Sequence, residues 1–237
     1  MNFGLIKDNL NITLSKTAQT NFINFEQLFK FYNSHTNLIS KNDEINLFEK
    51  HIYDSLCLNL FLSKYGFVDI QTKILDIGTG GGFPAVPLAI AFDNLEIYPI
   101  DSIAKKIGFI ELVQKELRLG NIFPICKRVE ELPLKDKGSF DIVTSRAVAS
   151  LNLLLEYAIP YVKTGGYFVA FKSKLADEEI ENAQNALEVL NVKIVDRIKY
   201  SIPLAEDFTR ELIVIKKEQS TPAIYPRKSG MAKKRPL

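Results

Sequence analysis

A run of glycines stands between a predicted strand and a predicted helix, at residues 74–84, which read ILDIGTGGGFP. Glycine permits sharp turns and lets a ligand come close to the backbone. The start of the following helix offers free N–H groups, and Asp76 stands at the end of the strand. We therefore expect this loop to hold a nucleotide-like ligand. The competing interpretation, a tight turn without a ligand, is disfavoured by four glycines in this place.

Two classes of ligand are held by loops of this type. A dinucleotide site follows G-x-G-x-x-G, with alanine allowed in the last place. Counted from Gly78 the last place is Phe83, and counted from Gly80 it is Ala85, but Pro84 then interrupts the turn. The other pattern is an acid followed by alternating glycines, here Asp76, Gly78, Gly80 and Gly82. It resembles the first motif of class I methyltransferases, which bind S-adenosylmethionine. The positive charge of this cofactor can be stabilised by a nearby carboxylate.

A second acid follows at the end of the next predicted strand. Asp101 stands 25 residues after Asp76, where a carboxylate can accept the hydroxyl protons of a ribose. Asp101 or Ser102 could equally cap the helix that we expect from Ile103, and one residue can do both. The loop at residues 128–131 follows the third strand, at the sheet edge where an adenine would lie.

Other chemistries are disfavoured by what the sequence lacks. Residues 144–147, after the fourth strand, read TSRA in place of an Asn/Asp-Pro-Pro-Tyr segment, which disfavours methylation of the exocyclic amino group of adenine. Cys126 has no feature of a nucleophile. His35 and His51, the only histidines, have no ligand partner four residues on, so we expect no metal site.

The elements that position these residues divide the chain into a helical part and an alternating part. Residues 1–70 read as helical, with apolar faces over 22–32 and 46–63. Strands and helices then alternate, which predicts an α/β fold with a mostly parallel sheet. We expect seven strands, over 73–77, 95–100, 122–126, 140–145, 167–172, 192–200 and 212–216, and helices over 84–92, 103–119, 151–162 and 177–190. No helix separates the last two strands, so the last should run antiparallel.

Composition indicates a folded protein, with 237 residues, 46% hydrophobic and 24% charged. No apolar run reaches the length of a membrane span, and the N-terminal residues do not read as a signal peptide. Two distant cysteines exclude a disulfide scaffold, so we expect a reduced, cytoplasmic protein. The net charge of +2 conceals an asymmetry, because residues 216–237 carry +6 and the rest −4. A polyanionic partner and a merely solvated tail both remain open.

Seen in one register, these segments resemble the bacterial 16S ribosomal RNA (guanine-N7) methyltransferase family RsmG, also called glucose-inhibited division protein B. The segments that carry the resemblance are LDIGTGGGFPAVPLAI, DSIAKKIGFI, RVEEL, FDIVTSRAVASL, GGYFVAFKS, ELIVIKK and YPRKSGMAKKRPL, with NLIS and KHIYDSL nearer the N-terminus. They span nearly the whole chain. Gly81 and Met231 depart from residues that the family often carries, without altering the glycine turn or the tail charges.

The resemblance implies a class I, Rossmann-like methyltransferase fold in three parts. These are an N-terminal helical extension (1–70), a methyltransferase domain (71–218) and a basic tail (219–237). It implies S-adenosylmethionine as cofactor, leaving S-adenosylhomocysteine as product, and a guanine in the 530 loop of 16S rRNA as substrate. The partner is then 16S rRNA, the small ribosomal subunit or its precursor, and we expect a monomer without membrane association.

The resemblance and the motifs together give a set of site residues. The expected cofactor-binding residues are Asp76, Gly78, Gly80, Gly82, Phe83, Asp101, Ser102, Val129, Glu130 and Arg146. In the tail, an aromatic ring for base stacking stands among cations for phosphates. The expected RNA-binding residues are Tyr225, Arg227, Lys228, Lys233, Lys234 and Arg235.

No catalytic base is expected, because guanine N7 carries a lone pair and no proton. Arg146 and Lys172 are the candidates for a catalytic role, without a firm assignment. An arginine on N7 would block transfer, so we expect Arg146 on O6 or on the cofactor. Lys172 either contacts a phosphate or extends to the surface. His51 and Asp54 share a helix face, and either close the cofactor pocket or form a local pair.

Three alternative functions stay open at this point. A class I methyltransferase acting on another RNA, a small molecule or a protein keeps the glycine loop, but the last two leave the basic tail unexplained. An NAD(P)-dependent oxidoreductase would bind a different cofactor in the same loop. A non-catalytic RNA-binding module is disfavoured by the intact acids and glycines of the loop.

Overall fold

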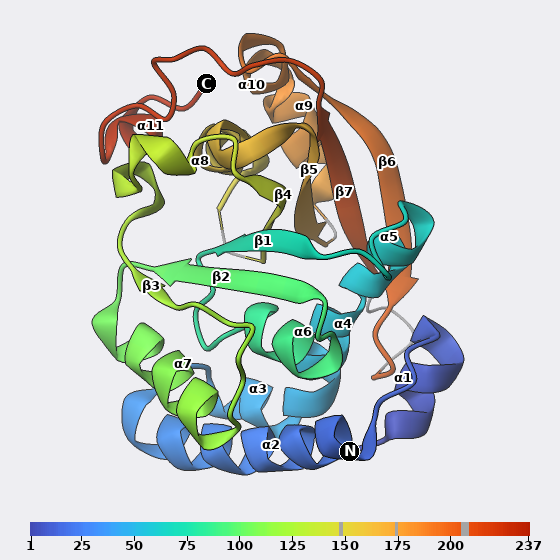
Figure 1. Ribbon diagram of the computed structural model, residues 1–237. Helices are drawn as coiled ribbons and strands as arrows, with labels where there is room; N and C mark the ends of the chain where they lie inside the picture. The colour runs from blue at the N-terminus through green and yellow to red at the C-terminus, as the bar shows by residue number, and fades with distance from the viewer. Residues whose placement is uncertain (147–148, 174, 205–208) are drawn as a thin grey trace.

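A seven-stranded sheet forms the centre of the computed structural model, which describes residues 1–146, 149–173, 175–204 and 209–237 (Figure 1). The strands are β1 (Thr72–Ile77), β2 (Leu95–Asp101), β3 (Ile125–Cys126), β4 (Phe140–Ser145), β5 (Val162–Lys172), β6 (Val192–Ser201) and β7 (Thr209–Lys217). Their order in the sheet is β3-β2-β1-β4-β5-β7-β6. β7 pairs antiparallel with both β5 and β6, whereas the pairs among β1 to β5 are parallel. The predicted mostly parallel sheet with a reversed last strand is confirmed.

Three strands differ from their expected extent by three residues or more, and one of them is β7, which begins at Thr209 rather than at residue 212. The third strand is reduced to Ile125–Cys126, with one isolated bridge from Ile97 to Ile122 before it. The fifth begins at Val162 rather than at residue 167, so it includes the glycine pair that seemed to precede it. The strand segment at Gly166 lies so close to the neighbouring backbone that no side chain fits there. A Cβ at that position would lie 2.6 Å from the carbonyl oxygen of Asp141, which only glycine avoids.

Helices cover both faces of the sheet (Figure 1). They are α1 (Phe3–Leu10), α2 (Lys16–Thr36), α3 (Lys41–Ile45), α4 (Asp54–Leu56), α5 (Leu58–Lys64), α6 (Ala85–Ala91), α7 (Ala104–Glu116), α8 (Leu151–Ala158), α9 (Ala176–Asn182), α10 (Gln184–Val189) and α11 (Met231–Lys234). Figure 1 shows α2, α6 and α7 on one face and α8, α9 and α10 on the other. None of the helices in the described ranges is long and apolar enough to span a bilayer.

Three expected helices are interrupted in the structure. Residues 46–63 include a π-helical segment (Phe48–Tyr53), followed by α4 and α5. Residues 177–190 divide at Ala183 into α9 and α10. The helix expected over 151–162 ends as α8 at Ala158 and continues as a 3₁₀ turn that contains Pro160, because proline lacks the N–H that an α-helix needs.

The N-terminal helices pack on the same face of the sheet as the glycine loop. Ser15 caps α2 by accepting a hydrogen bond from the N–H of Ala18 at 3.1 Å. Phe25 and Phe29 on α2 are fully buried, and their ring centroids lie 5.7 and 5.3 Å from that of Phe83 in the glycine loop. Burying each of these phenylalanines contributes about 2–3 kcal/mol. The N-terminal extension therefore packs against the glycine loop through α2 and helps to hold the loop in position.

Candidate functional site

The glycine loop leaves β1 and returns directly into α6, as the sequence predicts. Gly78, Gly80 and Gly82 all have positive φ angles, of 71°, 58° and 91°. A Cβ on Gly82 would lie 2.7 Å from the side chain of Val86, so glycine is required there on both counts. The N–H of Gly78 donates to the carbonyl of Ile100 at the end of β2, 2.9 Å away. The loop is thus fixed across the ends of β1 and β2.

Asp76 lies just before this loop and is fully buried. Neither of its carboxylate oxygens, nor the hydroxyl of buried Thr79, has a hydrogen-bond partner of normal geometry within the described chain. Burial raises the pKa of Asp76 to about 7, in spite of the lowering effects of nearby Thr79 and Arg146. A buried carboxylate without a partner is unfavourable, so the residues here fit a ligand that brings a positive charge or hydrogen-bond donors.

Asp101 ends β2 beside the loop, and its carboxylate is held from three sides. Its Oδ2 accepts from the N–H of Gly80 at 3.2 Å and lies 3.1 Å from the ammonium of Lys106. Its Oδ1 accepts from the N–H of Ile103 at 3.0 Å, so part of the expected capping role is present. Ser102 is exposed. Lys106, one helical turn along α7, is a site residue that the sequence motifs do not indicate.

The segment predicted to lie beside an adenine is a 3₁₀ turn, Val129–Glu131. Val129 is buried, and its carbonyl accepts from the hydroxyl of Tyr161. The carboxylate of Glu130 accepts from the N–H of Gly230 at 3.4 Å. The basic tail therefore reaches the edge of the predicted cofactor site.

Arg146, directly after β4, joins the N-terminal helices to the sheet. Its Nη1 donates to the carboxylate of Asp54 at 2.9 Å and to the carbonyl of Lys50 at 3.0 Å. Its Nη2 lies 2.7 Å from Nδ1 of His51, and the guanidinium carbon is 5.2 Å from the ring centroid of Phe83. The expected alternative, a local pair between His51 and Asp54, is wrong, because both side chains bind Arg146. Ala147 of the TSRA segment lies outside the described residues.

The contact with Arg146 fixes the protonation of His51. Arginine only donates, so Nδ1 accepts and the imidazole is neutral with its proton on Nε2. Burial and the charge of Arg146 lower the pKa of His51 to about 3. Its Nε2 is buried without a partner among the described residues, and its ring centroid lies 5.0 Å from that of Phe83. Buried Asp54 also accepts from the hydroxyl of Tyr200, at 2.6 Å, and no spacing in the sequence indicates this pair.

A cavity of about 740 Å³ opens on the other side of Arg146. Lys172, at the end of β5, lines it and is buried, which contradicts the expected surface lysine. Its ammonium lies 2.5 Å from the carboxylate of Glu179 and donates to the carbonyl of Ala149 at 2.7 Å. Glu179 stands in the first turn of α9, and its side chain is 25% exposed. It lines the same cavity.

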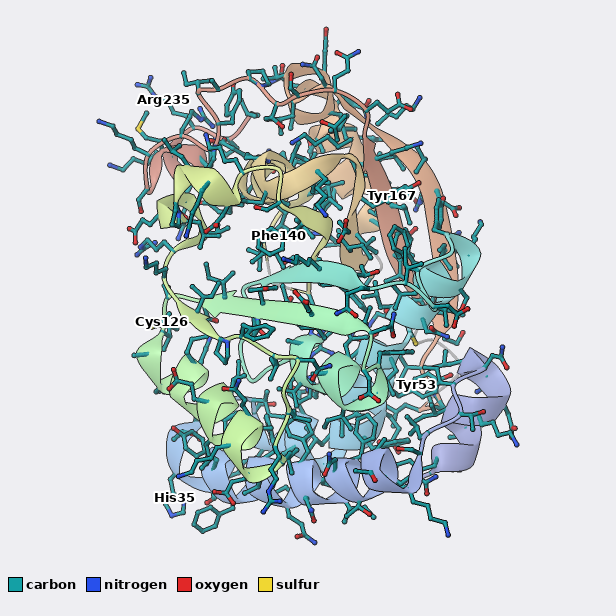
Figure 2. The ribbon with its side chains drawn as sticks, in the orientation of Figure 1. His35, Tyr53, Cys126, Phe140, Tyr167 and Arg235 are labelled. Atoms are coloured by element: carbon teal, nitrogen blue, oxygen red, sulfur yellow. The ribbon has the colours of Figure 1, made fainter. Side chains whose placement is uncertain are left out.

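The basic tail packs back on the domain. The guanidinium of Arg227 binds the carboxylate of Glu156 on α8, with Nε at 2.8 Å, and the ring of Tyr225 packs on the core beside α8. Because Glu156 is 1% exposed, Arg227 anchors the tail and is not one of the freely exposed cations. The exposed cations of the tail are Lys228, Lys233, Lys234 and Arg235. Figure 2 shows Arg235 near α11, whereas His35 lies on the outer side of α2.

The strand order, the acid at the end of β1, the glycines after it and the acid at the end of β2 define a class I methyltransferase fold. A SAM-dependent methyltransferase from Aquifex aeolicus aligns with a TM-score of 0.54 and 16% identity over 74% of this chain and 94% of that chain. TYW2 from M. jannaschii, solved in complex with AdoMet, aligns with a TM-score of 0.51 and 17% identity over 66% and 73%. These similarities establish the fold.

Sequence comparison identifies the family. The family model described as rRNA small subunit methyltransferase G matches residues 18–204. Proteins named ribosomal RNA small subunit methyltransferase G are 38% identical in Alkaliphilus oremlandii, over 96% of this chain and 94% of that protein, and 39% identical in Staphylococcus saprophyticus, over 95% and 93%. The chain belongs to this family, and the resemblance stated from its motifs is confirmed.

Proposed function

We propose that this protein transfers a methyl group from S-adenosylmethionine to N7 of a guanine in the 530 loop of 16S rRNA. Membership of the rRNA small subunit methyltransferase G family supports the substrate class. The observation that carries the cofactor is the buried carboxylate of Asp76 beside the glycine loop, whose oxygens have no hydrogen-bond partner of normal geometry among the described residues. A sulfonium cofactor with an ammonium group would supply the missing charge and donors.

The cofactor would lie over the ends of β1 and β2. Asp76 and the glycine loop would hold its methionine end, and the fixed carboxylate of Asp101 would accept from its ribose. The turn Val129–Glu131 would border the adenine, and Phe83 with Arg146 would close the side toward the cavity. When bound, this cofactor supplies an electrophilic methyl group on a sulfonium.

Methyl transfer to N7 does not require a general base in the protein. One S–C bond breaks and one N–C bond forms with the lone pair of N7, so no proton leaves the reacting atom. The residues present accordingly serve to position the base and to exclude water. Arg146 would contact the cofactor side, since its guanidinium faces Phe83 in the cofactor loop and three of its five N–H donors bind Asp54, His51 and the Lys50 carbonyl.

The tail would supply the contact with the rest of the RNA. Its four exposed cations lie on a segment anchored to α8 by Arg227, and the Leu237 carbonyl accepts from Asn152 near the start of that helix at 3.3 Å. The anchored tail lies beside Glu130, so it would place phosphates next to the cofactor site. The partner would be the small ribosomal subunit or its precursor, bound in the cytoplasm by a monomer.

Two measurements test this function. S-adenosylmethionine should raise the melting temperature of the protein and NAD(P) should not, because a ligand at 100 times its Kd stabilises by about 2.7 kcal/mol. With methyl-labelled cofactor, label should enter 16S rRNA of small subunits from cells that lack this activity. Stabilisation by NAD(P), or label entering only protein or small molecules, would contradict the proposal.

A further inference from the structure

The cavity beside Arg146 lies over a different part of the sheet from the glycine loop. The loop spans the ends of β1 and β2, whereas Arg146 follows β4 and Lys172 ends the adjacent β5. Since β1 and β4 are neighbours in the sheet, the cavity and the cofactor loop adjoin. Its volume of about 740 Å³ lies within the usual range for small-molecule sites.

A buried ion pair stands in the wall of this cavity. Lys172 is 6% exposed, and its ammonium donates to Glu179 and to the Ala149 carbonyl. An ammonium has three donors, so one is left over among the described contacts. The Oε2 atom of Glu179 takes the bond from Lys172, and its Oε1 has no hydrogen bond within the described residues. The pair thus offers the cavity a donor next to an acceptor.

This donor–acceptor order matches one edge of guanine. The Watson–Crick edge of guanine presents the O6 acceptor beside the N1–H and N2–H donors, and adenine presents a donor beside an acceptor. Bases acted on by enzymes are often read along this edge. N7 lies on the neighbouring Hoogsteen edge, beside O6 but outside the Watson–Crick edge, so a base held through O6, N1–H and N2–H keeps the lone pair of N7 free.

We propose that the Lys172–Glu179 pair reads the Watson–Crick edge of the target guanine, the ammonium binding O6 and the carboxylate binding N1–H and N2–H. The proposal rests on the proposed methylation of a guanine at N7. It replaces both the phosphate contact expected for Lys172 and the O6 contact expected for Arg146. Arg146 lines the same cavity and contacts Phe83 in the cofactor loop, so the Hoogsteen edge of the base, with N7, would be turned toward the cofactor loop.

The test compares guanine with inosine at the methylated position in reconstituted small subunits. Inosine lacks only the N2 amino group, so the wild type should methylate guanine with a kcat/KM about tenfold or more above inosine. The double variant K172M/E179L removes both charges together, which avoids a single unpaired buried charge. Its kcat/KM for guanine should fall, and the ratio of its kcat/KM values for guanine and inosine should approach one.

The control and a second variant keep the result interpretable. Lys163 and Asp141 form a 2.7 Å ion pair at the opposite ends of β4 and β5, so K163M/D141N should keep the wild-type preference. E179Q, which retains the size of the side chain, should lower kcat/KM for guanine more than for inosine. An unchanged preference in both pocket variants, with cofactor binding intact, would show that the pair is only structural. A wild type that does not methylate the guanine at all would overturn the proposed function as well.

Discussion

The guanidinium of Arg146 lies 2.9 Å from the carboxylate of Asp54, a residue 92 positions earlier in the chain. This ion pair connects the end of β4 with the N-terminal helices. Asp54 is 3% exposed and Arg146 17% exposed in their side chains, so water screens the pair weakly. The same guanidinium contacts His51 and faces Phe83. A substitution of Arg146 should therefore change both the free energy of unfolding and the packing of the cofactor loop.

Replacing Arg146 with alanine should destabilise the protein by about 3 kcal/mol, because it leaves the buried carboxylate of Asp54 without its cation. The value is at the low end for a buried pair, since Tyr200 still donates to Asp54. R146K should lose less, as lysine keeps the charge without the forked donors. Urea unfolding at pH 7 measures both. R128A, at an exposed arginine, is the control, and equal destabilisation by R128A and R146A would contradict this account.

Much of the fold could be predicted because its signals are local. The strand–glycine–helix segment at residues 74–84 and the alternation after it required only short stretches of sequence. The positions of the breaks were less predictable. Ala183 divides a helix without any proline or glycine, and Gly165 and Gly166 lie inside β5 although glycine normally weakens a strand. Tertiary packing decides both cases.

The site was predictable where its residues follow one another and not where the fold brings them together. Asp76, the glycines and Asp101 stand at strand ends, so the sequence located them. The partners of Arg146 come from 92 and 95 positions away, and Tyr200 meets Asp54 over 146 positions. Nothing in the local sequence around Glu179 indicates that it pairs with a buried Lys172.

Cofactor affinity should depend on the ionisation of Asp76. Its pKa of about 7 lies above the ordinary 3.8, so the free protein holds this proton between pH 4 and 7 and loses stability as the pH rises through that window. A cationic ligand binds the ionised form. The Kd for S-adenosylmethionine, measured by calorimetry, should therefore decrease as the pH rises. The decrease should be up to about tenfold for each pH unit below 7, and the Kd should level off above pH 7. D76N should bind weakly at every pH; the same steep dependence in D76N would contradict the assignment.

His51 should make the protein sensitive to acid. Its pKa of about 3 lies below the ordinary 6.5, so the stability it contributes is complete above pH 6.5 and is lost as the pH falls toward 3. In H51N the amide oxygen can replace Nδ1 as the acceptor for Arg146 but does not titrate. The free energy of unfolding of the wild type should fall relative to H51N by about 1 kcal/mol per pH unit below pH 6. Parallel curves for the two proteins would show that His51 does not titrate in this way.

The exposed cations of the tail should govern the salt dependence of RNA binding. If Lys228, Lys233, Lys234 and Arg235 each neutralise a phosphate of single-stranded RNA, log K against log salt should have a slope of about −3. Deleting residues 222–237 should flatten this slope. R227Q should leave the slope unchanged, because the Arg227 charge is already compensated by Glu156. If the slope is unchanged after the deletion, the tail does not bind the phosphates and is only a solvated segment.

Methylation at N7 of a guanine in 16S rRNA can be tested by mapping the methylated atom and its position together. Small subunits from cells lacking this activity would be incubated with the protein and S-adenosylmethionine, then treated with borohydride and aniline, which cleave RNA at N7-methylguanine. We predict one new cleavage in the 530 loop of 16S rRNA, absent without cofactor and strongly reduced with D76N. No cleavage in that loop, with cofactor binding demonstrated in the same preparation, would contradict it.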